Sequence, residues 1–264
     1  MSARPVPTAE EADYLLRTKG WVLFPSQLAE RQVAALSDDC DRVYEIGRQV
    51  QVANGVAANM EGAAHHIAGH GGPLDDFPEH FPLSDQVERF FDGKFIVLNY
   101  GAVLNPPGSR SYVFKPHRDI RAFSTNYRLS LNMLVMLGDF TPETGATMIL
   151  SGSHNVEALP SNEIFERYAE QIFGKAGDVV LFDSLTVHAA AENRSNAPRR
   201  ALTLCLGRPF MKPQMDWPRY LTPDVQARLT PAMRQLLGFN ARVASSLDEY
   251  YQPEERGPFR ADQR

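Results

Sequence analysis

Two segments near the start of the chain have apolar residues at helical spacing, so each predicts a helix. Thr8 and Glu11 match a capping box at the start of the first segment, and Gly20 is a suitable stop. An apolar run at 21–24 is typical of a short strand. The second helix is expected to follow Pro25, and its apolar positions are Leu28, Val33, Leu36, Cys40, Val43 and Ile46.

Short apolar runs dominate the middle of the chain and predict strands. Turn signals rich in Pro, Gly and Ser separate them, for example at 105–108 and 151–153. The runs cover residues 95–104, 112–119, 127–137, 147–150, 179–182 and 201–206. Many short strands bounded by such turns are typical of a β-sandwich or a barrel such as a jelly roll. We therefore predict a mainly β protein whose leading helices pack on one sheet.

Two regions depart from this pattern, although we interpret residues 1–264 as a single domain. Residues 51–92 lack a regular period and hold five glycines between 55 and 72, together with His65, His66 and His70. This region is too long for an ordinary connection, so we predict a lid or a substrate-binding insertion. A plain exposed loop and a second metal site are the alternatives. Residues 208–264 are interpreted as a C-terminal extension.

Composition and charge narrow the classes of function. The chain has 264 residues, 43% of them hydrophobic, and a formal net charge of −5, so it has no basic surplus for nucleic acid. It has neither an apolar run of about 18 residues, which a transmembrane helix needs, nor a signal-peptide pattern. Cys40 and Cys205 are expected to be free thiols. We predict a cytoplasmic protein that acts on a small molecule and contacts neither nucleic acid nor membrane.

The segment Lys115-Pro116-His117-Arg118-Asp119 carries the strongest chemical signal. His117 and Asp119 are two residues apart, so on a strand their side chains share a face. His188 follows the apolar run at 179–182 and supplies a third ligand. Two His and one carboxylate form the facial triad of non-haem Fe(II) oxygenases, which leaves positions free for a bidentate oxo acid and for O2. His154 is the alternative third ligand.

An oxo-acid cosubstrate with a distal carboxylate needs a fixed cation. Arg199 and Arg200 open the last strand, and their planar guanidinium groups suit a carboxylate. Strand alternation sends the two to opposite faces, and the pattern alone does not decide between them. Asn132 is a polar residue within an apolar strand. It is expected to bond the cosubstrate or the substrate, or to make a structural hydrogen bond.

In its motifs the chain resembles the phytanoyl-CoA dioxygenase family. Besides His117-x-Asp119, His188 and an Arg eleven residues later, the similar segments are 20–25, 144–147, 151–154 and 177–183. Thr144 and Ser151 depart from the family's usual Asn and Pro. The resemblance implies a double-stranded β-helix, or jelly roll. It also implies Fe(II) held by the three ligands, 2-oxoglutarate as cosubstrate with its distal carboxylate on Arg199, and O2 as the oxidant.

The resemblance therefore predicts a dioxygenase that hydroxylates a C–H bond of a small, polar metabolite and releases succinate and CO2. A desaturase or an epimerase would use the same iron site. A jelly-roll isomerase or hydrolase with another metal would not need 2-oxoglutarate. A non-catalytic β-sandwich binding module is the remaining alternative.

Overall fold

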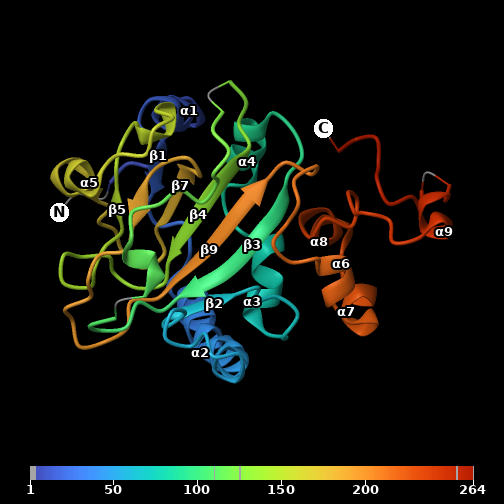
Figure 1. Ribbon diagram of the computed structural model, residues 1–264, viewed down its shortest axis with the longest axis horizontal. Coiled ribbons are helices and arrows are strands. Elements are labelled where there is room, and N and C mark those ends of the chain that lie inside the picture. Colours follow the sequence, from blue (N-terminus) through green and yellow to red (C-terminus); the bar gives the residue numbers. More distant parts are fainter. Residues whose placement is uncertain (1–3, 110, 125, 254, 264) are drawn as a thin grey trace.

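Two antiparallel sheets form the centre of the computed structural model, which describes residues 4–109, 111–124, 126–253 and 255–263 (Figure 1). The strands of the larger sheet are β1 (Trp21–Phe24), β2 (Ala63–His65), β3 (Ile96–Val103), β4 (Ser130–Met136), β7 (Val179–Asp183) and β9 (Ala201–Gly207). Those of the smaller sheet are β5 (Met148–Ile149), β6 (Glu170–Gln171) and β8 (His188–Ala189). Their orders are β1-β7-β4-β9-β3-β2 and β6-β5-β8. The predicted mainly β, jelly-roll fold class is confirmed.

Helices flank this pair of sheets. They are α1 (Ala9–Thr18), α2 (Glu30–Ala53), α3 (Pro73–Asp76), α4 (Ser84–Phe91), α5 (Asn162–Tyr168), α6 (Trp217–Tyr220), α7 (Pro223–Arg228), α8 (Pro231–Leu236) and α9 (Leu247–Tyr250), with 3-10 turns η1 (Phe77–Glu79), η2 (Tyr112–Phe114) and η3 (Ser153–Asn155). Figure 1 shows α6 to α9 gathered at one side of the molecule. Within the described ranges, no helix has the length and apolar character needed to cross a membrane.

The capping box predicted at the first helix is present. The Thr8 hydroxyl accepts a bond from the Glu11 N–H at 3.2 Å, and the Glu11 carboxylate accepts one from the Thr8 N–H at 2.7 Å. These two bonds satisfy backbone N–H groups that a helix start leaves without an internal partner. The second helix begins at Glu30, later than Pro25 suggested, and continues to Ala53.

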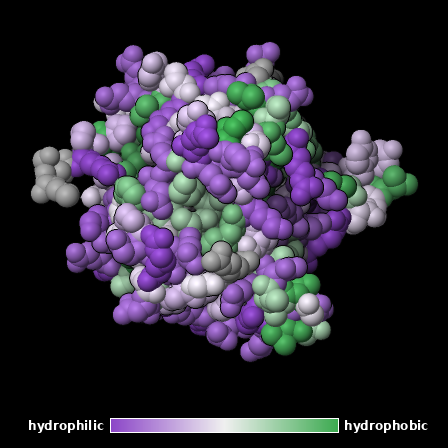
Figure 2. Space-filling view, turned by 60° about the vertical axis from the view of Figure 1, so that its left-hand side comes forward, coloured by the Kyte–Doolittle hydropathy of each residue, from purple (hydrophilic) through white to green (hydrophobic). Residues whose placement is uncertain are grey.

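The two faces of the larger sheet have different environments because side chains alternate along each strand. On β9, Leu202, Leu204 and Leu206 are buried in one apolar cluster with Leu16 of α1 and Leu36 of α2. This confirms that the N-terminal helices cover one sheet. The alternate β9 residues line the cavity between the sheets. Figure 2 shows a mainly hydrophilic outer face with hydrophobic residues gathered near its centre.

The strand predicted for residues 112–119 is wrong. Residues 112–114 form the 3-10 turn η2, and the segment joins the smaller sheet only through an isolated bridge between His117 and His188. Pro116 has no N–H to donate to a ladder, which explains why regular pairing does not extend through this segment.

Residues 51–92 have more regular structure than their composition suggested. Helix α2 extends into this region, β2 pairs with β3 at the edge of the larger sheet, and α3 and α4 follow. Phe90 and Phe91 of α4 belong to the same core as the sheet. The proposed lid movement of this region stays a prediction.

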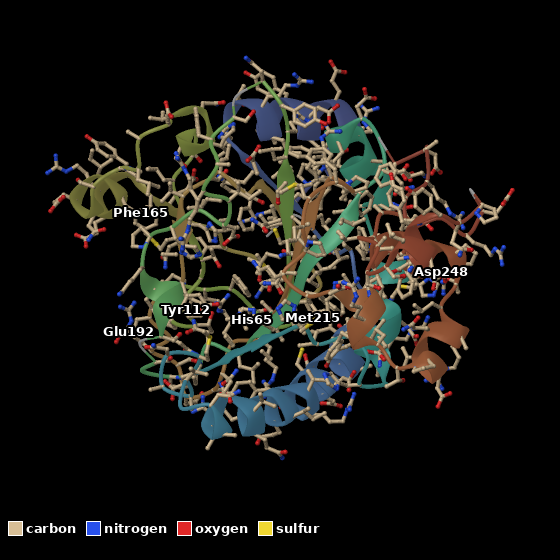
Figure 3. The ribbon with its side chains drawn as sticks, turned by 45° about the vertical axis from the view of Figure 1, so that its right-hand side comes forward. His65, Tyr112, Phe165, Glu192, Met215 and Asp248 are labelled. Atoms are coloured by element: carbon tan, nitrogen blue, oxygen red, sulfur yellow. The ribbon has the colours of Figure 1, made fainter. Side chains whose placement is uncertain are left out.

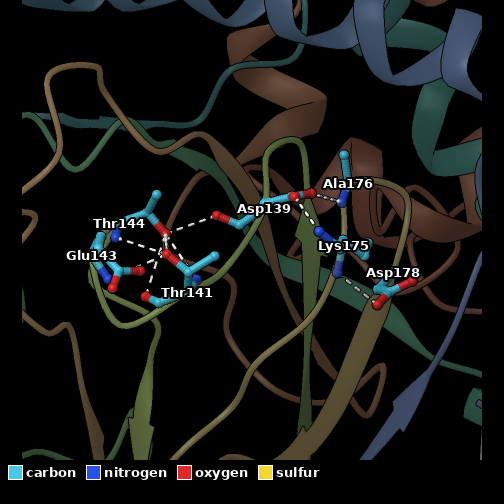
Figure 4. Close-up of polar contacts among 7 residues, drawn as sticks. All are labelled: Asp139, Thr141, Glu143, Thr144, Lys175, Ala176 and Asp178. Carbon is cyan, nitrogen blue, oxygen red and sulfur yellow. Dashed lines mark hydrogen bonds and ion pairs between the residues drawn. The ribbon is translucent and has the colours of Figure 1, made fainter. Parts of the chain in front are cut away.

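A polar network fixes the turn after β4 (Figure 4). The Thr144 hydroxyl donates to the Asp139 carbonyl at 2.8 Å and accepts from the Thr141 N–H at 2.9 Å. The Asp139 carboxylate bonds Lys175 Nζ at 2.6 Å and the Ala176 N–H at 3.1 Å. Thr144 therefore closes this turn with its hydroxyl, although the similar family has Asn there.

We expect Leu204→Ala to lower the free energy of unfolding by about 2–5 kcal/mol, because the Leu204 side chain is fully buried on the face of β9 that packs in the apolar core. Urea unfolding followed by circular dichroism measures the change. The control is Leu247→Ala, at a side chain that is 73% exposed, which should change the value by less than about 0.5 kcal/mol. Equal effects of the two substitutions would contradict this account of the core.

Candidate active site

Backbone hydrogen bonds bring His117, Asp119 and His188 together from distant parts of the chain. The His117 N–H donates to the His188 carbonyl at 3.0 Å, and the His188 N–H donates to the His117 carbonyl at 3.1 Å. The Asp119 N–H donates to the Ser184 carbonyl at 3.1 Å. One potential ligand atom from each of the three side chains then lies within 4.8 Å of the others. This spacing is short enough for one ion to contact all three.

Both imidazoles present the same nitrogen to the centre of this group. His117 Nδ1 lies 2.7 Å from the Lys115 carbonyl, and His188 Nδ1 lies 3.0 Å from the Thr186 carbonyl. A carbonyl only accepts, so each Nδ1 carries a proton, and in the neutral ring the lone pair of Nε2 is available to a metal. These Nε2 atoms lie 3.4 and 3.7 Å from the Asp119 carboxylate oxygens. The two rings are oriented as metal-binding histidines are.

Charge and hydrogen bonding keep Asp119 ionised. Burial pushes the pKa of its carboxyl upward, but His188, His117 and Asn132 together hold it below the ordinary value. Asn132 Nδ2 donates to Asp119 Oδ2 at 2.8 Å, so the predicted polar bond of Asn132 goes to this carboxylate. Burial lowers the pKa of His188, which favours the neutral imidazole that binds metals.

A cavity of about 1360 Å³ surrounds these three side chains. Both sheets contribute to its wall: Asn132 comes from β4, Thr203 from β9 and His188 from β8. Ligand pockets commonly measure about 300–1,000 Å³, so there is room here for two bound molecules.

Arg199 and Arg200 point to opposite faces, as strand alternation predicted. Arg199 is 4% exposed and lines the cavity, with its guanidinium 4.0 Å from the Phe140 ring centroid. Its Nε and Nη1 atoms are buried without a hydrogen-bond partner among the described residues. Burial lowers the pKa of Arg199 to about 9. Arg200 instead makes two bonds of 2.8 Å with Asp41 on α2.

The other histidines lie elsewhere. His154 Nε2 lies 3.0 Å from the Arg17 carbonyl, outside the cluster. His66 packs edge-on against Trp217, and His70 contacts the Tyr220 hydroxyl at 3.3 Å. In the part of the chain that the structure describes, only His117, Asp119 and His188 form a group able to hold a metal, so His65, His66 and His70 do not make a second one.

Several cavity-lining polar residues were not singled out from the sequence. They are Asn99, Tyr112, Thr147 and Gln214. Asn99 carries the same signal as Asn132, a polar residue inside an apolar strand, and bonds Gln214 at 3.0 Å. Tyr112 had no signal, because it lies on a 3-10 turn whose orientation depends on the rest of the fold.

Cys205 also lines the cavity, on the strand face that carries Thr203. Burial, with a smaller effect of Asp119, raises the pKa of its thiol to about 12. Among the described residues, the ligand atoms that lie close enough together for one ion belong to two imidazoles and a carboxylate, and Cys205 is not part of this group.

A jelly roll whose cavity is lined by two histidines and a carboxylate that lie close together is typical of non-haem Fe(II) oxygenases. The phytanoyl-CoA dioxygenase (PhyH) family model matches residues 16–201, and the chain belongs to this family.

Curated relatives agree with this assignment, and a solved structure agrees with the fold. The uncharacterized protein Rv1501 of Mycobacterium tuberculosis is 33% identical over 192 residues, which cover 71% of this chain and 70% of the relative. The dioxygenase trt7 of Aspergillus terreus is 25% identical, over 93% of this chain and 88% of its own. The crystal structure of SnoK, a non-haem alpha-ketoglutarate-dependent carbocyclase from nogalamycin biosynthesis, has a similar fold, with a TM-score of 0.61 and 20% identity. That similarity covers 87% of this chain and 95% of SnoK.

We expect iodoacetamide at pH 8 to alkylate Cys205 and Cys40 at least about 100-fold more slowly in the folded protein than in urea. Burial raises the pKa of both thiols to about 12, so only about one molecule in ten thousand carries the thiolate at this pH. Mass spectrometry of the two peptides measures the rates. Fast modification of Cys205 would show that a thiolate is present beside the candidate metal ligands.

Proposed function

We propose that this protein hydroxylates a C–H bond of a small polar molecule, with Fe(II) bound by His117, Asp119 and His188 and with 2-oxoglutarate as cosubstrate. The observation that carries the proposal is the pairing of this three-ligand group with the buried Arg199 in one cavity. When bound, Fe(II) and 2-oxoglutarate activate O2, with release of succinate and CO2.

The three side chains fit Fe(II) because one ligand atom of each already lies within 4.8 Å of the others. The Lys115 and Thr186 carbonyls hold the two rings through Nδ1, so neither ring must reorient to bind. Asn132 fixes one Asp119 oxygen, and its predicted contact with 2-oxoglutarate remains part of this proposal. Three ligands on one side of an ion leave the opposite positions for the cosubstrate and O2.

Arg199 fits the distal carboxylate of 2-oxoglutarate. A buried guanidinium whose Nε and Nη1 lack hydrogen-bond partners is costly unless a partner binds there, and an anionic carboxylate is a suitable acceptor for its N–H groups. This favours an oxygenase over a jelly-roll isomerase or hydrolase that works without 2-oxoglutarate. A binding module without catalysis would have no need of a three-ligand group beside this arginine.

The charges of the cavity favour an anionic substrate. Fe(II), Asp119, Arg199 and the doubly charged 2-oxoglutarate together are neutral. The other charged residues on the described wall are Lys115, Arg118, Arg121 and Glu157, a surplus of positive charge. Arg118 Nη1 donates to the Glu157 carbonyl at 2.8 Å and Nη2 to the Ser153 carbonyl at 2.8 Å, neither of which neutralises it. A substrate with a carboxylate or phosphate would balance this surplus.

A screen of small acids for stimulated succinate release, followed by mass spectrometry of the product, tests the reaction. Hydroxylation adds one oxygen atom to the substrate, desaturation removes two hydrogen atoms, and epimerisation leaves the mass unchanged. Desaturation or epimerisation would keep the iron site but contradict hydroxylation. A reaction that proceeds without 2-oxoglutarate would contradict the proposal that 2-oxoglutarate is the cosubstrate.

We expect His117→Ala, Asp119→Ala and His188→Ala each to lower Fe(II) affinity by more than about 100-fold. Loss of a residue that only supports a ligand typically costs about 10–100-fold, and loss of a ligand itself costs more. Asn132→Ala should fall in the smaller range, because Asn132 bonds Asp119. Anaerobic Fe(II) titration measures the affinities, with His154→Ala as the control that leaves them unchanged. A His188→Ala protein that binds iron normally would exclude His188 as a ligand.

We expect Arg199→Ala to raise the KM for 2-oxoglutarate by more than about 30-fold, because removing one member of a buried ion pair costs about 2–5 kcal/mol. Arg200→Ala is the matched control. It removes a partly exposed ion pair with Asp41 and should leave this KM within about twofold. Succinate release at varied 2-oxoglutarate concentrations measures both. The reverse pattern would assign the cosubstrate to Arg200.

A further inference from the structure

His65 and Tyr112 form a hydrogen-bonded pair on the cavity wall. His65 Nε2 lies 2.9 Å from the Tyr112 hydroxyl, and both residues line the cavity that holds His117, Asp119 and His188. Figure 3 shows the two labelled residues close together at the lower end of the sheets. Neither residue has a part in holding the metal or the cosubstrate as proposed above.

The fold holds this pair in place from two sides. His65 is the last residue of β2 and pairs with Gly101 of β3. A Cβ added at Gly101 would lie 2.7 Å from the Ala64 carbonyl oxygen and 3.5 Å from His65 Nδ1, so a glycine permits the close approach of β2. On the other side, η2 is tied to the segment after His188 by the bond from the Ala190 N–H to the Val113 carbonyl at 2.8 Å.

Both members of the pair are uncharged at neutral pH. Burial lowers the pKa of His65 and raises the pKa of Tyr112. The bond between the two residues uses His65 Nε2, and His65 Nδ1 makes no hydrogen bond among the described residues. The Tyr112 hydroxyl can still donate or accept one more hydrogen bond. Two neutral groups of this kind match an uncharged oxygen, such as a hydroxyl or a ketone.

We propose that His65 and Tyr112 are positioning residues that bind a hydroxyl or ketone oxygen of the substrate and so hold its reacting carbon toward the metal ligands. This inference rests on the proposed function. Together with the positive charge of the wall, it assigns the substrate to oxygen-bearing organic acids.

The chain contains a matched control for this pair. His70 Nε2 lies 3.3 Å from the Tyr220 hydroxyl, so it forms the same kind of contact. His70 and Tyr220 are absent from the cavity wall described for the chain. Substitutions in this second pair therefore remove the same kind of His–Tyr contact at a place outside the cavity wall.

The experiment compares Tyr112→Phe and His65→Leu with Tyr220→Phe and His70→Leu, each loaded with Fe(II) and 2-oxoglutarate. The probes are octanoate, cyclohexanecarboxylate and abietate, each paired with derivatives that carry one ketone or hydroxyl. Succinate release gives the KM for each probe, and product analysis gives the ratio of oxidised probe to succinate. The KM for 2-oxoglutarate and the slow succinate release without probe are measured as well.

We expect the two cavity variants to raise the KM for the oxygen-bearing probe by about three- to tenfold and to lower the ratio of oxidised probe to succinate. The values for its oxygen-free counterpart, the KM for 2-oxoglutarate and the release without probe should not change. The Tyr220 and His70 variants should match the wild type in every measurement.

Three results would overturn the inference. Equal losses for both members of a probe pair would indicate a structural role, and a raised KM for 2-oxoglutarate would place the pair at the cosubstrate. Wild-type protein that turns over 2-oxoglutarate but is stimulated by no oxygen-bearing probe would show that the assigned substrate group is wrong. A wild type that binds neither Fe(II) nor 2-oxoglutarate would instead contradict the proposed function, and the inference would fall with it.

Discussion

The pair of backbone hydrogen bonds between His117 and His188 is the constraint on which the candidate site depends. It fixes two residues from distant parts of the sequence at one point, with ring centroids 4.5 Å apart. Because both Nδ1 atoms face backbone carbonyls, the same segments that form the bridge also set the tautomer of each ring. The fold thus prepares the donor atoms before any ion binds.

The two faces of the larger sheet have different roles: one packs in the apolar core, and the other lines the cavity of the candidate site. One face buries leucines against the helices, so the strands stay rigid. The other face offers Asn132, Thr203 and Arg199 to the cavity. A buried guanidinium without a hydrogen-bond partner destabilises the folded protein. Asn132 and Thr203 lie on strands, which hold side chains more precisely than loops do.

The three histidines at 65, 66 and 70 are close in sequence but have different surroundings in the fold. His65 ends a paired strand and faces the cavity, whereas His66 packs on Trp217 and His70 contacts Tyr220. Their glycine-rich surroundings predicted freedom of the backbone. The sheet pairing and the α3 and α4 helices instead supply local order, which a search for periodic apolar residues missed because these elements are short.

The sequence by itself predicted the mainly β fold class, the capped first helix and most of the main strands, because apolar periodicity and turn chemistry are local properties. The motifs predicted the family. The sequence also brought His117, Asp119, His188 and Arg199 forward through their spacing and the family resemblance. Only the tertiary structure decided that Arg199 faces the cavity while Arg200 meets Asp41, that Asn132 bonds Asp119, and that Tyr112 meets His65. Each of those contacts joins residues from separate elements, and a linear pattern contains no information on which strand face closes over a cavity.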